Sequence, residues 1–206
     1  MTRRLAAILS ADAKDYSRLM ADDEAATVRT VTEYRELLRA AIVEARGRVV
    51  DSVGDNLLAE FVSVIDAVAC AVAVQARLAE RNAGLPERRR MAFRIGINLG
   101  DVLAEGERIY GDGVNVAARI ERLADGGGVC ISGTVYDQVL GKLGLEWESL
   151  GEQTVKNIAR PVRAYRLRAT KAGATAAGGP RPEVPADRPS IAVLPFENMS
   201  GDSEQD

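Results

Sequence analysis

The stretch RVVDSVGDNLLAEF, residues 48–61, decides the fold of this 206-residue chain. Two short apolar runs flank the polar tip SVGDN, a pattern typical of a β-hairpin with a tight turn. We therefore expect two adjacent antiparallel strands at 48–53 and 57–61. Asp51 and Asp55 lie four residues apart around the tip. The spacing leaves open whether they are turn residues or carboxylates placed for chemistry.

Strand and helix patterns alternate on both sides of the hairpin. Upstream, the run LAAILSA predicts a buried strand that ends at Asp12, and apolar residues at helical spacing predict a helix from about residue 22 to 44. Downstream, Ser63 and Asp66 form a capping signature for a second helix, and AFRIGINLG, residues 92–100, predicts a strong strand. The remaining expected elements are a hairpin partner at 102–104, a helix at 111–123, a strand at 129–132, a short helix at 134–139 and further strands within 145–167.

The order strand, helix, strand, strand, helix, strand predicts an α+β fold with a ferredoxin-like βαββαβ core and a C-terminal strand extension. In this topology the first two strands run parallel and the third lies between them. The end of the first strand and the tip of the hairpin then share one edge of the sheet. Asp12 and Asp55 are therefore expected to meet there.

The composition excludes several classes of function. A formal net charge of −3 gives no basic field for phosphate contacts, and only 4% of the residues are aromatic, so we expect no nucleic-acid binding. The absence of histidine removes Ser-His-Asp and Cys-His catalysis and the usual zinc sites. Cys70 and Cys130 lie in apolar runs and are expected to be buried, reduced thiols. No window approaches the ~20 apolar residues of a membrane span, which indicates a cytoplasmic chain.

The composition also predicts the domain organisation. Residues 1–168 carry the elements described above and are expected to form one domain. Residues 169–189 are rich in Ala, Gly and Pro, which is typical of a linker. The apolar run SIAVLPF then indicates that residues 190–206 are the start of a truncated second domain.

Two pairs of side chains are candidates for chemistry. Asp12 and Asp55 suit Mg²⁺, which is usually held by one or two carboxylates together with substrate phosphates. On spacing alone, the alternative is that Asp55 is a turn residue and Asp12 a helix cap. Asn115 and Arg119 lie four residues apart on the helix predicted at 111–123, so they share one face. An amide and a guanidinium there suit an anion, although a solvated helix face, taken alone, is the simpler explanation.

Four motifs, in this order, resemble the catalytic domain of class III nucleotidyl cyclases, the adenylate and guanylate cyclases. They are ILSADAKDYSRL, VVDSVGDNLLAEF, FRIGINLGDV and YGDGVNVAARIE. The tail LGEQTVKNIARPVRAYRL resembles the end of bacterial members, so the resemblance covers residues 3–168. The run SIAVLPFENMSGD resembles the opening of a TolB-like domain.

The resemblance implies a reaction and a role for each pair. Asp12 and Asp55 match the aspartates that bind two metal ions, Mg²⁺ or Mn²⁺. Asn115 and Arg119 match the residues that orient the ribose and stabilise the phosphate charge in the transition state. In the family these pairs lie on different subunits of a head-to-tail dimer, so a homodimer with two sites is implied. The ribose 3′-oxygen of ATP, or of GTP, would attack the α-phosphorus and release pyrophosphate, a step that needs no histidine base.

One departure from the family pattern lies in the loop after the first metal aspartate. The family has a glycine before an aromatic residue, whereas this chain has Asp15 before Tyr16. The loop of Ala13, Lys14, Asp15, Tyr16 and Ser17 is expected to present backbone amides to the phosphates. The acidic side chain of Asp15 is then either turned outward or repels the triphosphate.

Two further departures concern the base. Adenylate cyclases of this class carry lysine where this chain has Asp51, and aspartate, threonine or serine where it has Arg108. The reversed pair could recognise guanine, because arginine pairs well with its O6 and N7, and guanylate cyclases carry an acidic residue at the first position. The alternative is a direct Asp51–Arg108 ion pair across the base pocket, which would weaken base selection or abolish turnover. The sequence therefore predicts a nucleotidyl cyclase, or else a cyclase-homology module that binds nucleotide or only dimerises and regulates the domain behind the linker.

Overall fold

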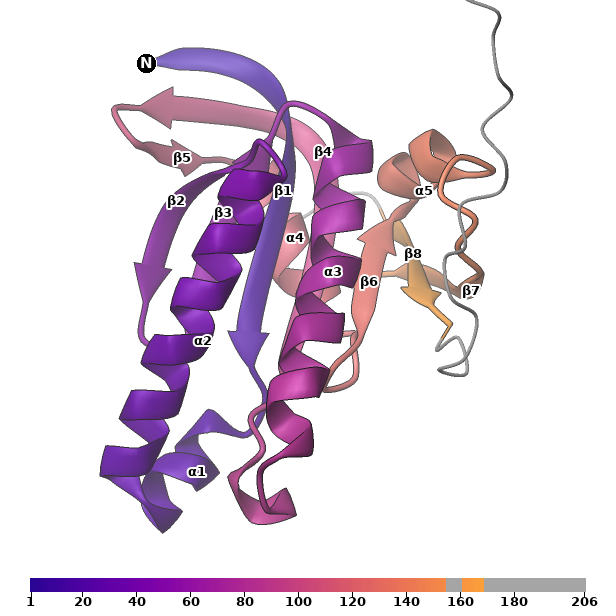
Figure 1. Cartoon of the computed structure of the whole chain (residues 1–206). Helices are drawn as coiled ribbons and strands as arrows, with labels where there is room; N and C mark the ends of the chain where they lie inside the picture. The colour runs from indigo at the N-terminus through magenta and orange to yellow at the C-terminus, as the bar shows by residue number, and fades with distance from the viewer. Residues whose placement is uncertain (155–160, 169–206) are drawn as a thin grey trace, which may run out of the picture. The chain divides into compact units, whose positions relative to one another are not determined.

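The computed structural model of the chain describes residues 1–154 and 161–168. In this part of the chain there are eight strands, which form one mixed sheet, and five α-helices (Figure 1), which confirms the predicted α+β fold. The predicted linker (169–189) and second domain (190–206) lie outside the described residues.

The bounds of the elements follow the predicted alternation of strand and helix. The strands are β1 (Thr2–Ala13), β2 (Arg48–Val53), β3 (Asn56–Phe61), β4 (Phe93–Glu105), β5 (Arg108–Tyr110), β6 (Val129–Ser132), β7 (Trp147–Gln153) and β8 (Val162–Leu167). The helices are α1 (Tyr16–Asp22), α2 (Glu24–Glu44), α3 (Val64–Ala83), α4 (Asp112–Glu121) and α5 (Gly133–Val139), with a 3₁₀ turn at Glu87–Arg89.

The strand order across the sheet is β2-β3-β1-β4-β6-β8-β7, with β5 paired to β4. β3 is antiparallel to both β1 and β2, so β1 and β2 run parallel with β3 between them, as the βαββαβ order predicts. Asp12 near the end of β1 pairs with Asn56, the first residue of β3. Because Asp55 precedes Asn56 in the hairpin turn, the two predicted metal aspartates lie at the same end of the sheet.

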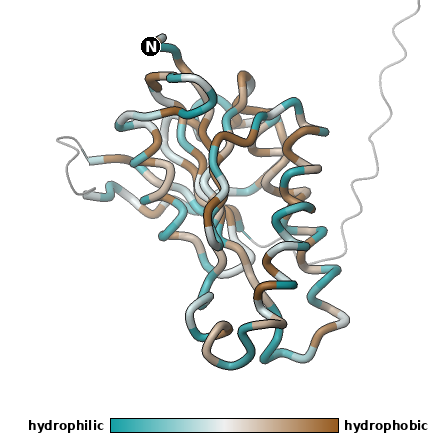
Figure 2. Tube along the Cα trace, turned by 90° about the vertical axis from the view of Figure 1, so that its left-hand side faces the viewer, coloured by the Kyte–Doolittle hydropathy of each residue, from teal (hydrophilic) through white to brown (hydrophobic). Residues whose placement is uncertain are grey.

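Helices α2 and α3 cover one face of the sheet, and α4 lies on the other (Figure 1). The outward turns of the helices are largely hydrophilic (Figure 2). In β1, Ala7, Leu9 and Ala11 belong to the main core under α2 and α3, whereas Ile8 packs with residues of the α4 side. Asp12 follows Ile8 by four residues, and side chains alternate between the two faces of a strand, so the side chain of Asp12 lies on the same face as Ile8, the face that α4 covers.

Glycines allow α4 to lie directly on β4. A Cβ atom at Gly96 would come within 2.2 Å of the backbone nitrogen of Glu121 and 2.5 Å of the carbonyl oxygen of Ala117. A Cβ atom at Gly100 would lie 3.1 Å from the backbone near the start of the same helix. This close approach holds the C-terminal end of α4 against the sheet face that carries Asp12.

The predicted hairpin between residues 92–100 and 102–104 is wrong. β4 is one continuous strand, and its hairpin partner is β5. The long strand β1 explains the difference, because it pairs with β4 in register along its whole length. The turn lies instead around Gly106, whose φ of 59° falls in the left-handed region that glycine favours. The sequence also does not predict α1, a seven-residue helix whose buried residue is Leu19.

Two further expectations concern a membrane-spanning helix and the two cysteines. Within residues 1–154 and 161–168, no helix combines the length and the apolar composition that a bilayer span requires. Cys70 and Cys130 are buried and free, as predicted. Burial raises the pKa of their thiols to about 11 and about 12, so neither is a reactive thiolate at neutral pH.

Candidate active site

Two carboxylates meet where β1 ends and the β2–β3 hairpin turns. Asp12 and Asp55 are partly buried and lie within hydrogen-bonding reach of each other. Burial first, and then the neighbouring Asp12 carboxylate, raise the pKa of Asp55 above its usual value. Two like charges held together in this way favour a bound cation. The structure thus places side by side the first pair that the sequence singles out.

The pair leaves positions open for further ligands. In the described ranges, no three Asp, Glu, Cys or His side chains converge on a point that could hold a metal ion. Mg²⁺ suits such a site, since it keeps several waters and takes one or two carboxylates plus phosphate oxygens. The oxygen donors of Asp12 and Asp55 therefore fit a hard divalent cation, to which a phosphate-bearing ligand can add further oxygens.

Arg94 is a member of this cluster that is not predicted from the sequence. It is the register partner of Asp12 across β1 and β4, and its Nη2 lies 2.5 Å from Asp12 Oδ2. Its Nε is buried and has no hydrogen-bond partner among the described residues. The ion pair with Asp12 offsets part of the negative charge that Asp12 and Asp55 bring to this end of the sheet. The one available signal is that Arg94 is the single charge in the apolar strand pattern FRIGIN.

Glu121, the last residue of α4, is a second side chain of this cluster that is not predicted from the sequence. It is 3% exposed and accepts a hydrogen bond from Ser10 Oγ at 2.9 Å. Its Oε1 lies 3.8 Å from Arg94 Nη2. Burial raises the pKa of this carboxyl group to about 7; Asp12 adds to the shift, whereas Ser10 and Arg94 oppose it. The group therefore titrates near neutral pH, next to the Arg94–Asp12 ion pair.

The backbone conformation at Asp15 explains why the family pattern has a glycine at this position. Its φ and ψ angles are 57° and 27°, in the left-handed region that glycine adopts freely and that Asp and Asn tolerate better than other residues. The side chain is exposed. In the same loop, the amide of Lys14 donates to the carbonyl oxygen of Ala92 at 2.8 Å. That amide is therefore already used and does not contribute to the predicted phosphate loop of residues 13–17.

Asn115 and Arg119 lie on α4, one turn apart, as the sequence predicts. Asn115 is exposed and Arg119 is half-buried. Within the part of the chain that the structure describes, neither side chain forms a hydrogen bond or an ion pair. In a single protomer this second pair is thus not joined to the Asp12–Asp55 pair by any such contact.

Asp51 lies on β2 and Arg108 on β5, and the side chain of Arg48 connects β2 to the turn before β5. Asp51 follows a bulge in β2 and accepts a hydrogen bond from the amide of Ser52 at 2.8 Å. Arg108 is the first residue of β5, and both side chains are exposed. Arg48 Nη1 donates to the carbonyl oxygen of Glu107 at 2.9 Å, which ties β2 to the turn before β5. Asp51 and Arg108 form no ion pair with each other, so the structure does not show the direct ion pair across the base pocket that is one of the two alternatives for these residues.

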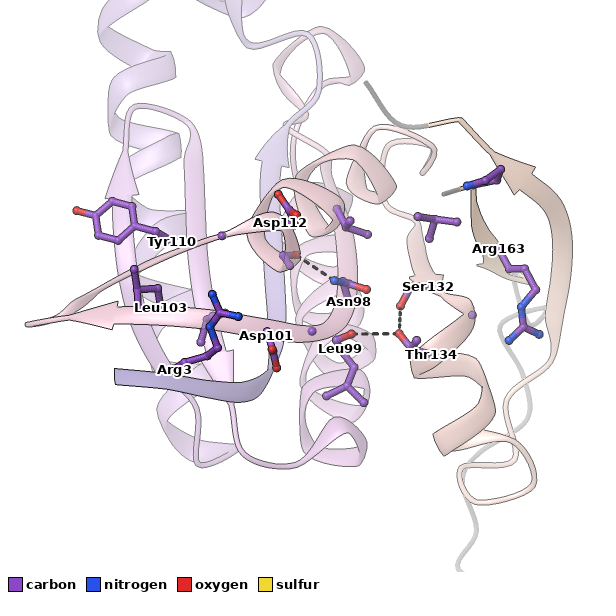
Figure 3. A pocket seen from close by; sticks show the side chains of 18 of the residues that line it. Arg3, Asn98, Leu99, Asp101, Leu103, Tyr110, Asp112, Ser132, Thr134 and Arg163 are labelled. Carbon is purple, nitrogen blue, oxygen red and sulfur yellow. Dashed lines mark hydrogen bonds between the residues drawn. The ribbon is translucent and has the colours of Figure 1, made fainter. Parts of the chain in front are cut away.

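A groove of about 730 Å³ lies elsewhere, along β4 and the starts of α4 and α5 (Figure 3). Asn98 Nδ2 donates to the carbonyl oxygen of Gly113 at 3.0 Å, and Thr134 Oγ1 donates to that of Leu99 at 3.2 Å. These bonds hold the starts of both helices against β4. None of the site residues predicted from the sequence lines this groove, so the predicted chemistry does not belong to it.

Comparison with known proteins points to one family. The family model described as the adenylate and guanylate cyclase catalytic domain matches residues 3–169. The curated relative "Putative adenylate cyclase 3" from Rhizobium meliloti (strain 1021) is 48% identical over 208 residues, which cover 98% of this chain and 35% of the relative. This chain thus spans about a third of the length of that relative.

Solved structures share the fold. A crystal structure of an adenylate/guanylate cyclase/hydrolase from Silicibacter pomeroyi is 39% identical, with a TM-score of 0.77, and the match covers 82% of this chain and 99% of that one. The crystal structure of the adenylyl cyclase CyaB from P. aeruginosa has a TM-score of 0.69 at 22% identity, over 83% of this chain and 97% of that one. The fold described above is therefore that of a cyclase homology domain.

Proposed function

This chain belongs to the adenylate and guanylate cyclase catalytic domain family, and we propose that it converts ATP, or GTP, to the 3′,5′-cyclic nucleotide and pyrophosphate. The observation that carries the proposal is the meeting of Asp12 and Asp55 where β1 ends. The topology brings any two residues at these positions together, and carboxylates at both of them create a site for hard cations. A nucleoside triphosphate supplies the remaining oxygen ligands.

Asp12 and Asp55 would hold Mg²⁺ or Mn²⁺, two ions per site. When bound, the ions lower the pKa of the attacking ribose hydroxyl group and offset the charge of the phosphates. Arg94 adds a positive charge on the same side of the site.

A second copy of the chain would complete the site. Asn115 and Arg119 carry groups that suit a ribose oxygen and a phosphate, and they are unpartnered among the described residues of one protomer. In a head-to-tail homodimer, each of two sites combines the carboxylates of one protomer with the amide and guanidinium of the other. There Arg119 stabilises the charge that develops on the α-phosphate as the 3′-oxygen attacks, and Asn115 orients the ribose.

Asp51 and Arg108 would select the base. Both side chains are exposed, and they do not pair with each other, so both are available to a nucleotide. Arg108 can donate to O6 and N7 of guanine, and Asp51 can accept from the N–H groups of guanine. These charges favour GTP, whereas the name of the relative from Rhizobium meliloti favours ATP. Both nucleotides are therefore candidate substrates.

The same unusual charges favour a second candidate function, a cyclase-homology module that binds nucleotide or only dimerises and regulates a neighbouring domain. Asp12, Asp55, Asn115 and Arg119 argue against it. A module that does no chemistry has no physical need for all four of these side chains.

The test is the product that the purified chain forms with Mn²⁺ and either ATP or GTP, separated by chromatography and identified by mass. We expect cyclic AMP or cyclic GMP together with pyrophosphate. Asp55→Ala should abolish both products while circular dichroism shows an unchanged fold. Asp137→Ala, which removes an exposed carboxylate paired with Arg163, is the matched control and should retain activity. The absence of cyclic nucleotide from either substrate would contradict the proposal and favour the module.

A further inference from the structure

Arg35 of α2 binds the turn that carries the predicted metal and base residues. Its Nε donates to Ser52 Oγ at 2.9 Å, and its Nη2 donates to the carbonyl oxygen of Ser52 at 2.7 Å and to Ser52 Oγ at 2.6 Å. Its Nη1 donates to the carbonyl oxygen of Gly54 at 3.1 Å. All three guanidinium nitrogens are thus directed at the stretch between Asp51 and Asp55.

Apart from the pairing of Asp51, Ser52 and Val53 with β3, this turn has few contacts that fix its position. β2 is the edge strand of the sheet, and its pairing with β3 is interrupted by a bulge just before Asp51. Val53 is 71% exposed, and nothing lies within 4 Å of the place where a Cβ atom of Gly54 would be. Within the described residues, Arg35 is the side chain from outside the hairpin that donates hydrogen bonds to residues 51–54.

The geometry of the contact explains why arginine is suited to this position. Two backbone carbonyls two residues apart are bound by one rigid, planar group, so their separation and direction are set together. A lysine ammonium group is a single point on a flexible stem and cannot impose the same geometry. The carbonyls of Ser52 and Gly54 lie next in sequence to Asp51 and Asp55, so the orientation of the turn determines where both carboxylates point.

We propose that Arg35 is a positioning residue: it sets the β2–β3 turn so that Asp55 meets Asp12 and Asp51 faces the base. The roles given to the carboxylates of Asp51 and Asp55 rest on the proposed function. The hydrogen bonds of Arg35 to the turn do not depend on it. Arg35 touches neither metal nor substrate in this proposal and acts through the backbone of the turn.

The first readout is the binding of Mn²⁺ alone, measured by electron paramagnetic resonance without nucleotide or turnover. We expect the dissociation constant of Mn²⁺ to rise about tenfold in Arg35→Ala, the effect typical of a residue that supports a metal ligand. Arg35→Lys should not restore the parent affinity. Arg39→Ala, on the same helix, removes an arginine paired only with Glu36 at 3.7 Å among the described residues and should match the parent.

The second readout is amide hydrogen exchange of the hairpin, which needs neither metal nor activity. Exchange in residues 51–56 should be faster in Arg35→Ala than in the parent, and unchanged in Arg39→Ala. Ser52→Ala removes the hydroxyl contacts and leaves both carbonyl contacts, so its exchange should fall between these two. It also provides a milder variant if Arg35→Ala does not fold.

The outcomes separate this inference from the proposed function. If the parent forms no cyclic nucleotide, the proposed function is wrong, whereas the comparison of hairpin exchange still decides the role of Arg35. If Arg35→Ala and the parent show equal Mn²⁺ affinity and equal hairpin exchange, the inference is overturned whatever the activity of the chain. If both readouts change in Arg35→Ala and not in Arg39→Ala, the inference holds.

Discussion

Replacement of Glu121 by glutamine tests whether this carboxyl group is held neutral beside the carboxylate pair. Glu121 is 3% exposed, and burial raises its pKa to about 7. The groups that face it are Ser10, Asp12, Arg94 and Arg122. A glutamine fills the same space, stays neutral at every pH and still accepts the hydrogen bond from Ser10 Oγ. The substitution therefore removes the titration with little change in packing.

The sign of the effect follows from where the protons are bound. Between pH 4.5 and about 7 the folded chain keeps a proton on Glu121 that the unfolded chain has lost. The stability that depends on this proton is complete below the unfolded pKa and disappears as the pH rises through the folded one. The pKa lies about 2.5 units above 4.5, and each unit corresponds to about 1.4 kcal/mol, so the charged form costs up to about 3 kcal/mol.

Urea unfolding of the parent and Glu121→Gln at pH 4, 5, 6, 7 and 8 measures this difference. The single tryptophan, Trp147, provides the fluorescence signal, and one protein concentration is kept throughout because association also stabilises the folded state. The variant should gain stability relative to the parent from pH 4 to pH 8, by up to about 3 kcal/mol. Glu80→Gln, in which an exposed carboxylate of α3 is lost, is the control. A constant difference would show that Glu121 does not titrate in this range. A loss of relative stability at pH 8 would show that Arg94 holds Glu121 as a charged partner.

Three further substitutions test other parts of the structure. Gly96→Ala places a Cβ atom within 2.2 Å of the backbone nitrogen of Glu121, so urea unfolding should show a free energy of unfolding that is lower by about 1–3 kcal/mol or more. Unchanged stability would contradict the close packing of α4 on β4. Asp15→Gly relieves the left-handed conformation, so the free energy of unfolding should rise by up to about 1 kcal/mol and the KM for the triphosphate should fall; a higher KM would mean that the carboxylate helps to bind substrate. Asp51→Ala should change the ratio of kcat/KM for ATP and GTP more than the Mn²⁺ dependence, and the reverse would place Asp51 with the metal ligands.

The sequence predicts the core of the fold because its signals are local and agree with one another. The apolar runs around SVGDN give both strands of the hairpin, and the order of the elements gives the parallel arrangement of β1 and β2. From these two facts alone Asp12 and Asp55 are expected at the same end of the sheet, where the structure has them. The boundary of β4 is wrong because its length is set by pairing with β1, a partner about ninety residues away in sequence.

The rest of the cluster around Asp12 depends on register and packing that a single sequence does not contain. Arg94 meets Asp12 only because of how β1 and β4 are aligned. Glu121 reaches Ser10 only because Gly96 lets α4 lie on the strand. Arg35 lies on a helix whose rotation over the sheet places it at the hairpin turn. In each case the residue type is visible in the sequence, but its partner is not.

Mixing two inactive variants distinguishes a site shared between protomers from any arrangement within one. Asp55→Ala removes a carboxylate and Arg119→Ala removes a guanidinium. In a head-to-tail dimer that contains one protomer of each variant, one site therefore lacks both groups and the other site keeps both. After equal amounts are mixed and allowed to exchange, formation of cyclic nucleotide should recover to roughly a quarter of the parent rate, since half of the dimers are mixed and each has one intact site. Each variant alone should be inactive. If the mixture stays inactive although both variants are folded and dimeric and the parent is active, the two pairs of residues do not act in one shared site.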